Sequence, residues 1–169
     1  MPITPLHMGP GILLKALLHG SFSLMVFGWS QIVVDIQPLF VLLTGEGQLH
    51  GFSHTYIGAT LLAIFSGLSG KYLGEIGLKI LGIARRSNPV EIAWRVAFVS
   101  AFIGTYSHVA LDSIMHGDVE PFYPLSGSNE LLGVMTVDAL HWFCLDSALL
   151  GAIIYYAALY VANRRNKAV

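Results

Sequence analysis

Long apolar runs alternate with short polar segments along this chain. Four such runs cover residues 12–43, 56–81, 92–115 and 140–161. A helix needs about 20 apolar residues to cross the hydrocarbon core of a bilayer, so each of the last three runs predicts one crossing. We therefore expect an all-α integral membrane bundle of four to five helices, with residues 1–169 forming a single transmembrane domain.

Two of these runs depart from a simple crossing. The first contains 32 residues, which is too long for one crossing, and it is interrupted near Gly28-Trp29-Ser30. It predicts either two short helices or a re-entrant hairpin. The second carries Lys71 and Lys79 in its final third. Its buried part is expected to end near Gly70, with the lysine ammonium groups reaching outward to the membrane surface.

Composition supports a membrane protein and excludes other classes. Hydrophobic residues make up 54% of the chain and charged residues 11%, whereas soluble domains contain roughly 25% charged residues. The formal net charge is −1, so the chain lacks the basic surface that nucleic-acid binding requires. Cys144 is the single cysteine in the sequence, which excludes an intrachain disulfide and a thiolate metal cluster.

Basic residues are unevenly distributed among the connections. Residues 44–55 and 117–139 contain no lysine or arginine, whereas basic side chains surround the link between the second and third runs and follow the last run: Lys79, Arg85, Arg86, Arg95, Arg164, Arg165 and Lys167. In a bacterial inner membrane, the positive-inside rule would place this link and the C-terminus on the cytoplasmic side. The loops without basic residues are expected at the extracytoplasmic face.

Histidines and carboxylates lie beside these loops. His50 and His54 precede the second run at a spacing of four, and His108, Asp112 and His116 repeat the same spacing in the third. Ionisable groups are costly at bilayer depth and therefore indicate a functional site. Nitrogen and oxygen ligands suit zinc, and also manganese or iron. A divalent metal, with zinc as the first choice, is the expected cofactor.

A structural interpretation of the same residues stays open. Asp112 would then simply pair with His108, and His50 would be solvated at a helix start where Ser53 or Thr55 supplies the N-cap. In the metal-site interpretation, by contrast, Gly51 would let the backbone approach a ligand closely.

Further polar groups lie inside or beside the apolar runs. Asp35 is a candidate metal ligand, a hydrogen-bonded partner that orients a histidine, or the ion-pair partner of Lys15. His19 is better explained as a donor in a hydrogen bond between helices than as a ligand. Asp138 and His141 lie at the start of the last helix, from where they would complete the site. Asp146, deeper in that helix, is a weaker candidate for orienting a ligand.

The order of several short sequence motifs resembles that in a known family. After His7 come Val-Val-Asp-Ile-Gln around Asp35, then His-Gly-Phe-Ser-His-Thr, then Gly-Thr-Tyr-Ser-His-Val-Ala-Leu-Asp-Ser, and finally Phe-Tyr-Pro. Over residues 5–125 this is similar to the membrane-bound, metal-dependent hydrolases of the inner membrane, some of which are LexA-regulated. The His-x-x-x-Asp element is also distantly similar to zinc-dependent phospholipase C.

The resemblance implies a set of metal-site residues, with some departures from the family pattern. Val34 stands where the family has proline, Gln37 replaces a second acidic residue, and Gly51 replaces a frequent arginine that would clamp phosphate. His116 has no counterpart in that pattern. The metal-site residues carried over from the resemblance are His7, Asp35, His50, His54, His108 and Asp112.

The expected activity is hydrolysis of a phosphoester or lipid-like substrate at the extracytoplasmic face, in contact with the lipid bilayer. Six ligands exceed what one tetrahedral ion requires, and two ions about 3.5–4 Å apart suit in-line attack on a phosphodiester. Asp112 is expected to bridge metals, and Asp35 or His116 to carry protons. The alternative is a non-catalytic metal-binding or structural membrane protein. The sequence does not fix the oligomeric state.

Overall fold

The computed structural model describes residues 5–85, 87 and 89–166. Across this part of the chain the regular structure is entirely helical, so the predicted all-α class is confirmed. Arg86, Lys167 and the side chain of Arg165, which contributed to the predicted orientation, lie outside the described residues.

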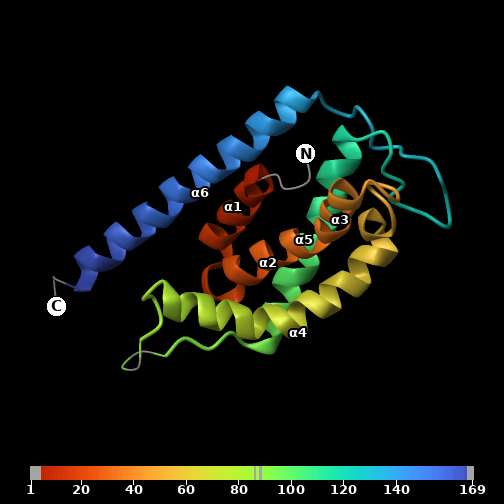
Figure 1. Ribbon diagram of the computed structural model, residues 1–169. Coiled ribbons are helices and arrows are strands. Elements are labelled where there is room, and N and C mark those ends of the chain that lie inside the picture. The colour runs from red at the N-terminus through yellow and green to blue at the C-terminus, as the bar shows by residue number, and fades with distance from the viewer. Residues whose placement is uncertain (1–4, 86, 88, 167–169) are drawn as a thin grey trace.

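The helices form two groups (Figure 1). The long helix α6 packs along α1, while α2, α4 and α5 pack against one another and α3 continues from α2 toward the loops. The elements in chain order are η1 (Pro5–His7), α1 (Met8–Leu18), η2 (His19–Ser21), α2 (Leu24–Val34), α3 (Ile36–Thr44), η3 (Phe52–His54), α4 (Tyr56–Ile80), α5 (Trp94–Met115) and α6 (Val137–Asn166).

The first apolar run consists of three short helices and is not interrupted where the sequence indicated. Gly28, Trp29 and Ser30 lie within α2, so the break expected there is wrong. The chain instead breaks at η2, where His19 has a positive φ of 46°. The Lys15 ammonium group stabilises this break, because it donates to the carbonyl oxygens of His19 at 2.7 Å and Phe22 at 2.8 Å.

A second break separates α2 from α3 at Asp35. Proline lacks an N–H group, so Pro38 cannot donate to the carbonyl of Val34 as a continuous helix would require. Pro38 is tolerated in the first turn of α3, where such donors are not needed. Asp35 therefore lies at a helix junction, where its carboxylate can turn toward α5.

Small side chains bring α2, α4 and α5 close together. Ala59 and Ala63 of α4 and Ala97 and Ala101 of α5 are completely buried. At Gly104 of α5, an added Cβ would collide with the Ser30 hydroxyl of α2. Such small residues allow close helix packing in a membrane, and here they do so within one chain.

Lys71 does not reach outward as expected. Its side chain is buried, and its ammonium group donates to Glu75 Oε1 at 2.7 Å, to the Ile92 carbonyl at 2.9 Å and to Glu91 Oε1 at 3.4 Å. This cluster fastens the segment before α5 to α4. Packing of α4 continues through the buried Gly74, beyond the end that the lysines suggested.

Two segments of the described chain are long and apolar enough to cross a membrane: Leu24–Thr44, across α2 and α3, and Val137–Arg164 in α6. Only 17% of the apolar window in α6 is buried inside the protein, so most of its apolar surface lacks a protein partner. Length and composition alone support these two segments, and the other predicted crossings stay predictions.

Candidate metal centre

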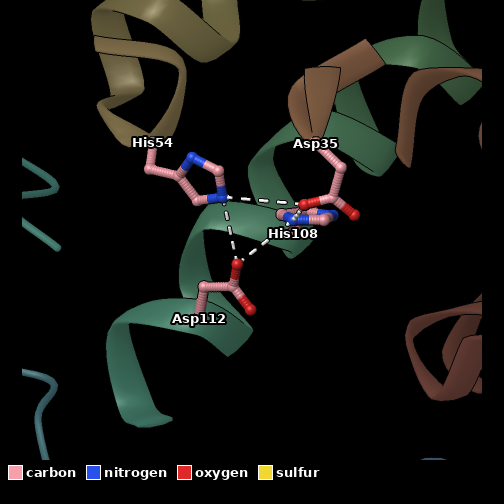
Figure 2. Close-up of side chains that lie close together, drawn as sticks. All are labelled: Asp35, His54, His108 and Asp112. Atoms are coloured by element: carbon pink, nitrogen blue, oxygen red, sulfur yellow. Dashed lines mark hydrogen bonds and ion pairs between the residues drawn. The ribbon is translucent and has the colours of Figure 1, made fainter. Parts of the chain in front are cut away.

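Four buried side chains converge between α5, η3 and the α2–α3 junction (Figure 2). His108 Nε2 lies 3.2 Å from both Asp35 Oδ1 and Asp112 Oδ2. His54 Nε2 lies 3.1 Å from the same oxygen of Asp112 and 4.0 Å from Asp35 Oδ1. Two imidazole nitrogens and two carboxylate oxygens therefore face a common point.

These separations fit one metal ion. Zinc binds nitrogen and oxygen ligands at about 2.0–2.2 Å, which places neighbouring ligand atoms of a tetrahedron about 3.3–3.5 Å apart. Three of the four separations above are 3.1–3.2 Å and the fourth is 4.0 Å. The spacing is thus close to that of a four-ligand zinc site without large movements of the backbone.

The hydrogen bonds of Gln31 favour a metal over a simple ion pair. The Gly104 carbonyl can only accept, so it takes a hydrogen bond from Gln31 Nε2 at 3.0 Å. Gln31 Oε1 then accepts from His108 Nδ1–H at 2.7 Å. In the neutral ring this leaves a lone pair on Nε2, aimed at two carboxylate oxygens.

His108 Nε2 makes no hydrogen bond of acceptable geometry despite these near neighbours. Carboxylates and an imidazole lone pair repel one another unless a cation lies between them. A proton on Nε2 would not point directly at either oxygen, whereas a metal ion could bind the nitrogen and both carboxylate oxygens at once. The orphaned nitrogen is therefore the feature of this centre that a metal ion best explains.

His7 completes the wall of the centre. It is buried, both of its nitrogens lack hydrogen-bond partners among the described residues, and Nε2 lies 3.6 Å from Asp112 Oδ1. Its ring packs edge-on against His108 with centroids 4.9 Å apart. Burial, together with the charge of His108, lowers the pKa of His7 to about 4. The ring is therefore neutral at pH 7 and offers a lone pair.

The loop before α4 holds His54 in place. Thr55 caps α4 by accepting from the Gly58 amide at 2.9 Å, which confirms the predicted helix start. The Ser53 hydroxyl lies 2.9 Å from His54 Nδ1, leaving Nε2 for the centre. Burial lowers the pKa of His54, so this ring too favours the neutral state that binds metals.

Gln37 and Gly51 act together in this loop. Gln37 Oε1 accepts from the Ser53 amide at 2.9 Å, and its Nε2 donates to the Gln48 carbonyl at 3.2 Å. A Cβ at Gly51 would collide with Gln37 Nε2. The absence of a side chain at Gly51 thus makes room for Gln37, and Gln37 positions the loop where the family pattern has an acidic residue.

His50 and His116 lie beside the buried cluster. The His50 ring packs against His54 with centroids 4.8 Å apart and stacks on His116 at 4.4 Å. Its Nδ1 donates to Asp118 Oδ2 at 2.9 Å. Burial opposes the charged form of Asp118, but this hydrogen bond and the neighbouring histidines together hold the pKa of Asp118 below its usual value.

The remaining candidates lie elsewhere. The Lys15 ammonium group donates to the backbone carbonyls at η2 and is not the ion-pair partner of Asp35. The other groups belong to neither histidine cluster of the described chain: His19, Asp138, His141 and Asp146.

Sequence reasoning missed Gln31 and Asp118. Gln31 lies four residues before Asp35 in an apolar run, a spacing that places both on one helix face. Asp118 follows His116 by two residues at the end of α5. Both signals were present, but neither identifies a partner by itself.

Neither family models nor curated proteins nor solved structures show a match to this chain.

Proposed function

We propose that this protein is a membrane-embedded, metal-dependent hydrolase that acts on a phosphoester or lipid-like substrate at the extracytoplasmic face. The observation that carries the proposal is the buried His108 Nε2, which faces two carboxylate oxygens at 3.2 Å without a hydrogen bond. Burying such charged groups is costly unless they are paired or bind a metal.

Five side chains would hold the metal: His7, Asp35, His54, His108 and Asp112. Neutral imidazole and carboxylate ligands suit zinc, manganese and iron, and zinc is our first choice. When bound, zinc lowers the pKa of water from 15.7 to about 7 and so supplies hydroxide at neutral pH.

The protein's own residues orient and enclose this chemistry. Asp112 turns Oδ1 toward His7 and Oδ2 toward His54 and His108, so both of its carboxylate oxygens lie among the residues that would hold the metal. Gln31 fixes His108, as a hydrogen-bonded partner of a metal ligand commonly does. His116 lies half-buried at the outer end of the cluster.

A membrane location supports the choice of substrate. The two apolar segments Leu24–Thr44 and Val137–Arg164, and the absence of basic residues from sequence positions 44–55 and 117–139, support an integral bundle with its histidine loops extracytoplasmic. A centre at that surface would meet lipid headgroups and other amphipathic phosphoesters.

The test is elemental analysis combined with an activity screen of detergent-purified protein. We expect stoichiometric zinc, manganese or iron, and hydrolysis of bis(p-nitrophenyl) phosphate or a phospholipid. His108→Gln should lose the metal of the buried centre and the activity, whereas Asp146→Asn, at an exposed position on α6, should keep both. Metal without turnover of any phosphoester would indicate a binding protein. Absence of metal even after reloading would favour a purely structural role for the histidines.

A further inference from the structure

A second group of metal-binding side chains lies at the outer edge of the buried centre. His50, His116 and Asp118 each offer one ligand atom within 4.8 Å of the others. The His50 and His116 rings stack at 4.4 Å with an interplanar angle of 24°. The three side chains come from the loop before η3 and from the end of α5, so the fold brings them together and helix periodicity does not.

This group shares no side chain with the buried one. The centres are adjacent, since the His50 ring packs against the His54 ring at 4.8 Å. Their surroundings differ: the four residues of the buried cluster are enclosed, whereas the Asp118 side chain is 56% exposed. A site with three protein ligands keeps a position open, as catalytic zinc sites do, and the outer group offers three such ligands.

The open side of this group faces a cavity of about 470 Å³, which His50 and Asp118 help to line. Acidic and neutral residues complete the wall, among them Thr55, Glu120 and Tyr123, and no lysine or arginine occurs among the described residues that line it. An anionic phosphate would be repelled by these carboxylates. It needs a cation in the wall to bind.

We propose that His50, His116 and Asp118 bind a second divalent cation, whose open positions hold the phosphate group of the substrate in this cavity. This inference rests on the proposed hydrolase function and assigns a separate role to each of the two ions. The buried ion belongs to the enclosed centre, and the outer ion supplies the positive charge that the described wall of the cavity lacks. The outer ion is the more exchangeable of the two, because fewer protein ligands and more water surround it.

The experiment compares metal stoichiometry in two variants of the full-length, detergent-purified protein. Wild type reloaded with zinc should retain about two equivalents, as two separate ligand sets require. His116→Ala/Asp118→Asn should retain about one equivalent, and Glu130→Gln, an exposed carboxylate outside both clusters, should retain about two. Thermal unfolding of the double variant checks that the fold persists.

Binding of inorganic phosphate gives a second readout that does not depend on turnover. Zinc-loaded wild type should bind phosphate at least about tenfold more tightly than the double variant, since the variant lacks the outer ion, whose three protein ligands leave a position open. Equal stoichiometry and equal phosphate affinity in the two proteins would overturn the second site while leaving the buried centre, and hence the hydrolase proposal, intact. A wild type without any metal would overturn both.

Discussion

Gln31 decides which nitrogen of His108 faces the two carboxylates. Its amide is held by the Gly104 carbonyl at one end and by His108 Nδ1 at the other. A lone glutamine in an apolar helix is usually read as a packing defect or a helix contact. Here it fixes the tautomer of a buried imidazole, which determines what the centre can bind.

Gln31→Leu removes that control while keeping a similar volume. Loss of a partner that orients a metal-ligating histidine typically costs 10–100-fold in metal affinity, and we expect a loss in that range. Competition with a chelator of known affinity measures it, with Gln48→Ala as the matched control because the Gln48 side chain is exposed. Unchanged affinity in Gln31→Leu would show that the tautomer is fixed elsewhere.

Metal binding at His108 should release a proton. Without a metal, a proton is needed between His108 Nε2 and the oxygens of Asp35 and Asp112, and the incoming cation displaces it. Apparent affinity then rises as pH rises, about tenfold per pH unit for one proton. Calorimetric titration with zinc in buffers of different ionisation enthalpy measures the number released. A pH-independent affinity would contradict this assignment.

At the scale of elements, breaks in the helices position the ligands. Pro38 ends α2 so that Asp35 lies at a junction, and the short η3 segment presents His54 before α4 begins. The i, i+4 pair on α5 was predictable from spacing alone. Pro38 is a sequence signal for the helix break at Asp35, whereas the sequence signal for the helix break at His19 is weak.

Gly51 and Gln37 form a pair that a double variant can separate. Gly51→Ala should displace the Gln37 side-chain amide, with which its Cβ would collide, and we expect about 1 kcal/mol of destabilisation from the weakened Gln37 hydrogen bonds. Combining it with Gln37→Ala frees the space. The double variant should therefore be more stable than the sum of the single changes, as thermal unfolding of all three variants would show. Strict additivity would refute the contact.

The contact between α1 and α6 positions His7. Helix α6 approaches so closely that a Cβ at Gly9 would meet the Cys144 carbonyl. Gly9→Ala should therefore push the start of α1 away and move His7, lowering both stability and metal content. Gly20→Ala is the control, because a Cβ there meets nothing within 4 Å. Elemental analysis of the two variants side by side distinguishes them.

For the whole molecule, the class of fold was easier to predict than the site. Apolar runs indicated α4, α5 and α6 closely, since long helices follow directly from composition and length. The placement of His7 beside Asp112 depends on how α1 packs against α6, which no local pattern encodes. The burial of Lys71 was mispredicted for the same reason, because the Ile92 carbonyl that accepts from its ammonium group at 2.9 Å lies in another segment.

Orientation is testable on the intact molecule. Cys144 is buried, so cysteines introduced at exposed positions dominate labelling. Ser128→Cys in the loop after α5 should react with a membrane-impermeant maleimide in cells whose outer membrane has been permeabilised. Ser87→Cys in the basic link should react only after lysis, as the positive-inside rule requires. The reverse pattern would place the centre on the cytoplasmic side.

The ligands of the two proposed sites come from residue 7 to residue 118, across nearly the whole set of packed helices. In the proposed orientation they meet only after synthesis has passed residue 118 and the loops have been translocated. In that orientation, no assembled site would be exposed to the cytoplasm, where metal chaperones and buffered zinc reside. The protein would therefore acquire its metals from the extracytoplasmic pool, and its activity would track metal supply outside the cell.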